Sequence, residues 1–244
     1  MFGDQADIGK FLRFRGRGDY DLNVKGNLNP YKIFREWNFK ELALDETNQY
    51  TPYIDGTSAV ALANGGITLT TAATDAKVCS YAFGGLFVRC AKNPVVEFKF
   101  QIDGIANVAI NAVLTDAKVE ASGLLPFLIS GTTITDTATD AAGFCFDTAQ
   151  DTDRFYRINT NNGTDAGTLL TAIEAPLAAA TDIRVRVALD TSGNAHFYYN
   201  GVDVGYKTLA VRTTVSYVPY FGIRNRNASA HVATLRCVRL WEDV

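Results

Sequence analysis

The stretch that decides the fold reads Ile183-Arg-Val-Arg-Val-Ala-Leu189, Asp190-Thr-Ser-Gly-Asn194, Ala195-His-Phe-Tyr-Tyr199 and Asn200-Gly201. Apolar and polar residues alternate, a tight turn follows, and the same order is then repeated, which is typical of an antiparallel meander. Two further strand-like stretches, Tyr217–Arg224 and Thr234–Trp241, come after it. The pattern predicts an all-β fold for this part of the chain.

The same alternation recurs earlier in the chain, between segments rich in Gly, Asn, Asp and Thr. The stretches are Gly66–Thr71, Val96–Ile102, Val108–Leu114 and Asp153–Ile158. Each such sheet buries one face, and two of these faces are hidden most simply by stacking about 10 Å apart. The 244 residues fit one large domain. We therefore expect an antiparallel β-sandwich of the jelly-roll kind.

The composition is that of an ordinary globular protein, with 47% hydrophobic and 20% charged residues. The sequence has no apolar run near the roughly 20 residues that a membrane helix needs. Its first residues also lack the basic start, apolar centre and small-residue cleavage site of a secretory signal. We expect a soluble protein that is made in a cytoplasm and has no membrane partner.

Charge is distributed unevenly along the chain. Residues 1–40 hold eight Lys/Arg and five Asp/Glu, whereas residues 41–244 hold fifteen and twenty-one. Many glycines and few periodic apolar positions predict an extended basic arm and connector over 1–40, with the sandwich over 41–244. A short helical turn within Tyr31–Leu44 is the alternative for the connector. The candidate partner-binding residues of the arm are Lys10, Phe11, Leu12, Arg13, Phe14, Arg15 and Arg17.

The sequence offers no arrangement of residues that indicates catalysis. Paired carboxylates of the Glu-x-Asp-x-x-Glu kind, which glycoside hydrolases of sandwich fold carry on one strand, are absent. The adjacent Asp45 and Glu46 would face opposite sides of a strand. His196 and His231 have no Gly-x-Ser-x-Gly nucleophile elbow to serve, and no phosphate-binding loop is present. We therefore predict no catalytic residues and no enzymatic activity.

The four cysteines also fail to indicate a metal or cofactor site. Cys79, Cys90, Cys145 and Cys237 lack C-x-x-C spacing and a nearby His ligand, so they are expected to be buried free thiols. A Cys79–Cys90 disulfide is the alternative. Asp147, Asp151 and Asp153 lack the spacing of a dedicated calcium loop. We predict neither metal nor cofactor.

Several stretches together resemble a group of bacteriophage virion proteins with a concanavalin-like, LamG-like sandwich. They are Gly65–Thr71, Val95–Asp103, Leu114–Ala117, Gly143–Thr148, Arg154–Tyr156 and the strand-like stretches from Ile183 to Trp241. The resemblance spans about residues 57–241 and implies a capsid decoration or cement protein, a head fibre or a tail-associated component. It implies a place in the virion, after assembly in the host cytoplasm.

The arm lies outside this resemblance and suggests how such a protein would attach. Its cations would be attracted to an acidic neighbour, and its apolar residues could insert between subunits of the major capsid protein or another virion protein. Four cations in an acidic protein are few for nucleic acid, which we do not expect as a partner. Repeated sites on a shell favour a homo-oligomer such as a trimer.

A carbohydrate-binding adhesin of the tail or head fibre is the alternative function, with a host-surface glycan as its partner. Sandwiches hold sugars through aromatic rings and side-chain amides. The rings that the sequence offers are Tyr198, Tyr199, Tyr217, Tyr220 and Trp241. Because alternation buries about half of such a set, no individual residue is assigned to a glycan site.

Overall fold

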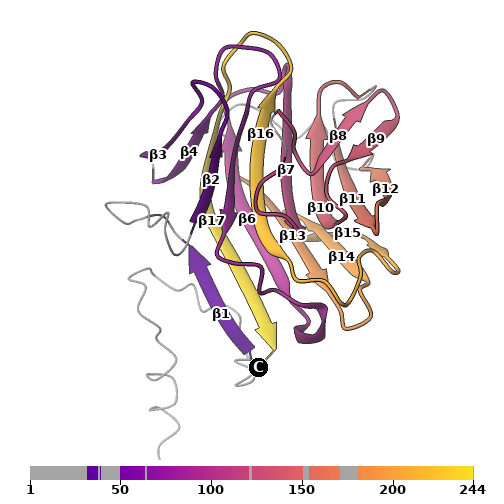
Figure 1. Ribbon diagram of the computed structural model, residues 1–244. Coiled ribbons are helices and arrows are strands. Elements are labelled where there is room, and N and C mark those ends of the chain that lie inside the picture. Colours follow the sequence, from indigo (N-terminus) through magenta and orange to yellow (C-terminus); the bar gives the residue numbers. More distant parts are fainter. Residues whose placement is uncertain are drawn as a thin grey trace, which may run out of the picture.

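Two antiparallel β-sheets packed face to face form the body of the described part of the chain, as its computed structural model shows (Figure 1). The structure describes residues 32–37, 39, 50–63, 65–120, 123–150, 154–170 and 181–243. No helix in these ranges is long and apolar enough to cross a membrane. The predicted all-β sandwich is confirmed.

The first sheet, which we call sheet A, has the strand order β15-β14-β13-β6-β17-β4-β3, and β1 also pairs with β17. Its strands are β1 (Lys32–Trp37), β3 (Ala59–Ala63), β4 (Gly66–Thr70), β6 (Val95–Ile102), β13 (Ile183–Leu189), β14 (Ala195–Tyr199), β15 (Val202–Lys207) and β17 (Val232–Asp243). The predicted meander is therefore β13 to β15, and the first two of these strands have the predicted bounds.

The second sheet, sheet B, has the order β12-β11-β10-β7-β16-β5-β2. Its strands are β2 (Tyr50–Ile54), β5 (Val78–Phe83), β7 (Val108–Thr115), β10 (Asp140–Asp147), β11 (Phe155–Asn161), β12 (Thr164–Leu169) and β16 (Val218–Asn225). A 3-10 turn, Cys90–Lys92, precedes β6. Strands far apart in sequence alternate in both sheets, so folding depends on long-range pairing.

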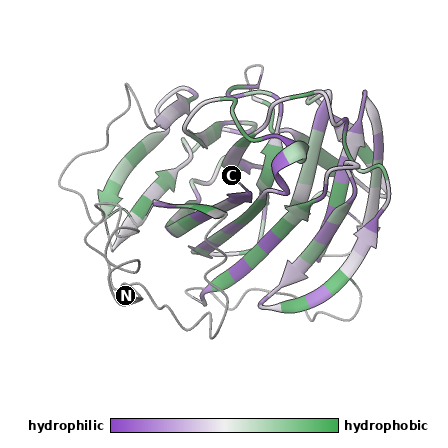
Figure 2. Cartoon of the chain, turned by 90° about the horizontal axis from the view of Figure 1, so that it is seen from below, coloured by the Kyte–Doolittle hydropathy of each residue, from purple (hydrophilic) through white to green (hydrophobic). Residues whose placement is uncertain are grey.

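The main core lies between the two sheets and is rich in phenylalanine. Phe100 of sheet A and Phe221 of sheet B are both fully buried, with ring centroids 4.9 Å apart. Along β13 the residues alternate between buried and more exposed, as its sequence predicts. Figure 2 shows hydrophobic and hydrophilic residues following one another along several strands. Period-2 patterning thus builds the sandwich, with the apolar face of each sheet turned inward.

A second, smaller core covers the outer face of sheet B. The segment between β7 and β10 forms a hairpin of β8 (Phe127–Ser130) and β9 (Thr133–Asp136), which lies beside β10 and β12 (Figure 1). Leu125, Phe127 and Ile129 are fully buried there. This cover explains why β7 and β10 are buried along their whole lengths.

Two polar clamps hold the hairpin on sheet B. The Asn111 side chain donates to the carbonyl oxygen of Phe127 (3.0 Å) and accepts from the Phe127 N–H (2.8 Å). The fully buried Asp147 accepts from the Ile129 N–H (2.9 Å) and pairs with Arg226. Because buried polar groups need partners, these residues specify where the hairpin docks.

Two expectations for the chain differ from the structure. The helical turn considered within Tyr31–Leu44 is wrong for its first part, because Lys32–Trp37 forms β1 along β17. Trp37 is buried and contacts Phe83, with ring centroids 5.8 Å apart, and this burial favours a strand in place of a connector. The alternative of a Cys79–Cys90 disulfide is also wrong, since both thiols are free and buried.

Candidate functional site

The outer face of sheet A carries charged and aromatic side chains from six of its strands. Strand register aligns six of them in a row across the sheet, perpendicular to the strands. In order from β15 to β1 they are Asp203, Tyr198, Arg186, Glu97, Arg239 and Glu36. The row brings together residues from six strands, so no local sequence motif reveals it.

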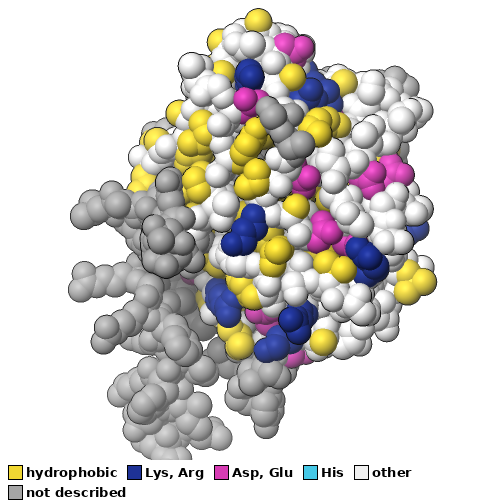
Figure 3. Space-filling view, in the orientation of Figure 1, with side chains coloured by type: hydrophobic (Ala, Val, Ile, Leu, Met, Phe, Trp, Pro, Cys, Tyr) yellow, Lys and Arg dark blue, Asp and Glu magenta, His cyan; other side chains and the backbone are white. Residues whose placement is uncertain are grey.

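Most charges of this row are paired with a neighbour of opposite sign. Arg239 Nε lies 2.9 Å from Glu36 Oε1, and its Nη1 lies 3.4 Å from Glu97 Oε1. The Arg186 guanidinium lies over the Tyr198 ring, 4.4 Å from its centroid. Over the side of the molecule that Figure 3 shows, Lys and Arg side chains are mixed with Asp, Glu and hydrophobic ones. Opposite charges therefore alternate across the row.

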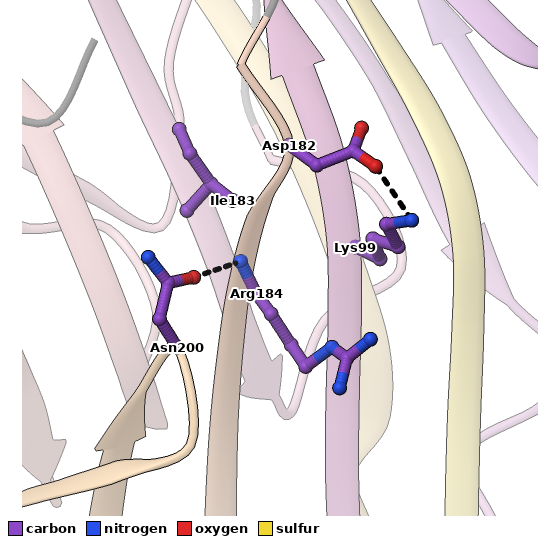
Figure 4. A pocket seen from close by; sticks show the side chains of 5 residues that line it. All are labelled: Lys99, Asp182, Ile183, Arg184 and Asn200. Carbon is purple, nitrogen blue, oxygen red and sulfur yellow. Dashed lines mark hydrogen bonds and ion pairs between the residues drawn. The ribbon is translucent and has the colours of Figure 1, made fainter.

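A hollow of about 250 Å³ lies beside this row, lined by Lys99, Asp182, Ile183, Arg184 and Asn200 (Figure 4). Lys99 Nζ lies 2.5 Å from Asp182 Oδ2, and Arg184 Nε lies 3.7 Å from Glu97 Oε1. Burial raises the pKa of Asp182, but the hydrogen bond and charge of Lys99, together with Gln101 and Arg236, hold that pKa below its usual value. The hollow thus presents ionised donors and acceptors side by side.

The turn between β14 and β15 places Asn200 at this hollow. Asn200 has a φ of 48°, a left-handed conformation that asparagine tolerates better than most residues. Its N–H donates to the carbonyl oxygen of Arg184 (2.7 Å), and its Oδ1 accepts from the Arg184 N–H (2.8 Å). The Asn-Gly pair that marks the turn in the sequence therefore also fixes an amide beside Arg184.

A second row on the same face is aromatic at both ends. Tyr206 contacts His196 at one end (ring centroids 4.4 Å apart), and Phe34 contacts Trp241 at the other (5.4 Å). Strand register connects the two pairs through Ala188 and Val95. Tyr206 is 42% exposed. This row gives the charged row an apolar border.

The aromatic rings that the sequence offered are divided by burial. Tyr198 and Trp241 lie on the outer face of sheet A and are half-buried, whereas Tyr199, Tyr217 and Tyr220 are buried. Burial raises the pKa of Tyr199 to about 12. The sequence interpretation did not name Tyr206. The signal for Tyr206 is its position after the Asn200-Gly201 turn, which pairs it with His196 on the neighbouring strand.

The other residues considered in the sequence are buried or fall outside the described residues. The arm residues Lys10 to Arg17 are outside them, as are Asp151 and Asp153. Asp147 belongs to the clamp with Arg226. Within the described ranges, no group of three or more His, Cys, Asp and Glu residues could hold a metal ion.

Comparison with known proteins shows the fold and leaves the family open. Neither the models of known protein families nor the curated proteins include a match. Among solved structures, a Bacillus licheniformis β-glucanase matches with a TM-score of 0.56 and 12% identity, over 85% of this chain and 97% of that one. The Emp47p carbohydrate recognition domain matches with a TM-score of 0.58 and 11% identity, over 88% of this chain and 96% of that one. The concanavalin-like part of the resemblance is confirmed.

The prediction of no enzymatic activity is contradicted by these neighbours. Besides the β-glucanase, a prokaryotic β-1,3-1,4-glucanase from a mouse hindgut metagenome shares the fold, with a TM-score of 0.56 and 9% identity over 86% of this chain and 98% of that one. The fold is therefore one that glycosidases use, and a missing motif was not enough to exclude their chemistry. Identities near 10% carry over the fold alone. The resemblance to phage proteins finds no support in these comparisons.

Proposed function

We propose that this protein binds carbohydrate, and that the outer face of sheet A is its binding surface. The observation that carries the proposal is the hollow beside Tyr198, where Lys99, Asp182, Arg184 and Asn200 meet. Structural neighbours that include a carbohydrate recognition domain support the same function. The alternative drawn from the sequence, a glycan-binding module, is thus the function that the geometry favours.

The charges at this hollow fit a neutral saccharide. Lys99 faces Asp182, and Arg184 faces Glu97, so cations and carboxylates balance. A sugar hydroxyl both donates and accepts, and it can therefore bridge a carboxylate and an amide or ammonium group. The 3.7 Å between Arg184 Nε and Glu97 Oε1 is long enough for a hydroxyl to contact both groups. Tyr198, held under Arg186, supplies a ring for stacking.

The test begins with a glycan array probed with the full chain, followed by calorimetry with the best neutral saccharide. Loss of a stacking ring is worth about 1.5 kcal/mol, so Tyr198→Ala should weaken binding about tenfold. Tyr198→Phe keeps the ring and should bind like the wild type. Asn200→Gly accommodates the left-handed turn, removes the amide and should also weaken binding. Equal affinity of all four proteins would refute the proposal.

We also propose, as a second candidate, that the N-terminal arm attaches the protein to a phage particle, at the major capsid protein or another virion protein. The favouring observation is β1, which lies within the predicted arm and connector of residues 1–40, after the cations Lys10 to Arg17. It pairs with β17 from Lys32↔Asp243 to Trp37↔Val238, and Trp37 lies in the core. A strand held in this way would transmit a pull on the arm into the sandwich. A closed homo-oligomer such as a trimer would match repeated sites.

Deleting residues 1–30 tests this second candidate, because it removes the arm and leaves β1 intact. The truncated chain should give the same far-ultraviolet spectrum and unfolding midpoint as the full chain. It should no longer sediment with particles. A truncated protein that coats particles as fully as the complete chain would overturn this candidate and leave the carbohydrate proposal standing.

A further inference from the structure

A groove at the edge of the sandwich differs from the hollow on sheet A in the charges of the residues that line it. It has a volume of about 190 Å³ and lies between β11 and β12 of sheet B and β14 and β15 of sheet A. Phe197 is almost fully buried at the groove. Tyr206 lines it from β15, and Asn159 and Thr168 line it from β11 and β12. An aromatic ring and polar side chains thus meet in a space that suits one sugar ring.

The charged residues that line this groove are both cations. They are Arg157 and Lys207, and no Asp or Glu is among the described residues that line it. Within the described part of the chain, the Arg157 guanidinium makes one hydrogen bond, from Nη1 to the carbonyl oxygen of Tyr206 at 3.5 Å. Lys207 forms no ion pair there. Two cations without a counter-charge in one groove attract an anionic group.

The backbone of β15 makes room for the Arg157 side chain. Gly205 has a φ of 134°, and a Cβ at this position would collide with the Arg157 guanidinium. A bulge between Phe197 and Tyr198 shifts the register of β14 and β15 next to it. Bulges commonly redirect side chains at sheet edges. The glycine and the bulge together let Arg157 of sheet B reach across to the edge of sheet A.

We propose that this groove binds the carboxylate of an acidic saccharide. Arg157 would engage the carboxylate, for which a guanidinium has matching geometry, and Lys207 would add a second charge. The hydroxyl of Thr168 and the amide of Asn159 would bind hydroxyl groups of the sugar. The groove shares no lining residue with the hollow on sheet A, so this proposal can be tested independently of the proposed function.

The test uses calorimetry with a trisaccharide of galacturonic acid and with the same trisaccharide after its carboxylates are reduced to hydroxymethyl groups. Wild-type protein should bind the acidic form at least tenfold more tightly at this groove, and added salt should narrow the difference. Arg157→Gln should lose about tenfold in affinity for the acid, and Arg157→Lys should lose less. Lys118→Gln, which removes a cation from the segment between β7 and β8, should bind like the wild type.

A second measurement does not depend on how the variants fold. In the wild-type protein, the Arg157 Nε–Hε resonance should shift on addition of the acidic trisaccharide. Equal affinity of wild type and Arg157→Gln, or an unmoved Arg157 resonance, would overturn the inference. Equally tight, Arg157-dependent binding of a hexaglutamate peptide would overturn the saccharide as occupant. Unchanged binding of the acid by Tyr198→Ala would show that the groove acts independently of sheet A.

Discussion

Replacing Asp147 with Asn should weaken the docking of the β8–β9 hairpin on sheet B and lower the free energy of unfolding, although the side chain keeps its shape. Asp147 accepts from the Ile129 and Ala149 N–H groups and pairs with Arg226, whose side chain is 19% exposed. The neutral amide removes the counter-charge of Arg226 and one of two acceptor oxygens. Breaking a buried pair on one side costs about 3–5 kcal/mol. In a chain of this size, that loss lowers the unfolding temperature by about 6–20 °C.

Chemical and thermal unfolding followed by circular dichroism measure this effect. Asp182→Asn is the matched control, because its pair with Lys99 is partly exposed and such pairs contribute about 0–1 kcal/mol. The double variant Asp147→Asn/Arg226→Met should recover part of the loss, since no uncompensated charge is left behind. A loss below about 1 kcal/mol for Asp147→Asn would show that the clamp does not hold the hairpin on sheet B.

Two further predictions concern the buried strands. Gly143→Ala should strongly destabilise the protein or prevent its soluble expression, because a Cβ there would meet the carbonyl oxygen of Ala112 and lie 2.6 Å from Val113 Cα; a normal unfolding midpoint would contradict this packing. Burial raises the pKa of Cys79 to about 12 and that of Cys90 to about 11, so about one Cys90 thiol in a thousand is ionised at pH 8. Iodoacetamide should therefore modify these two thiols slowly until the protein is unfolded, as read by mass spectrometry at pH 8; rapid labelling of the folded protein would contradict their burial.

The sequence predicts the strands of the meander well because two local signals agree there. Alternation gives the period, and the Asp190–Asn194 and Asn200-Gly201 turns give the ends. β1 escapes prediction because it is stabilised by β17, about two hundred residues further along the chain. Its short segment has no local turn to mark it. Long-range pairing of this kind leaves little trace in a single sequence.

The covered face of sheet B and the site on sheet A were harder to find. Asn111 stands within a fully buried, mostly apolar strand, and this indicates that its side chain needs a polar partner. That partner is the backbone of Phe127, sixteen residues away, which the sequence does not reveal. On sheet A, alternation predicts that Tyr198 and Arg184 share a face. The position of Arg184 opposite Lys99 depends on the register between β13 and β6. The sequence therefore predicts which residues point outward from each strand, but it does not predict which of them lie next to one another on different strands.

The most direct test of carbohydrate binding on sheet A is a titration of isotope-labelled full-length protein with a neutral oligosaccharide, followed by amide and side-chain chemical shifts. Binding at the proposed face should move the resonances of Tyr198, Arg184 and Asn200 together, with one dissociation constant. It should leave those of the β8–β9 hairpin in place. Shifts confined to sheet B or to the loops at the ends of the sandwich, with Tyr198 and Arg184 unmoved, would contradict the proposed surface.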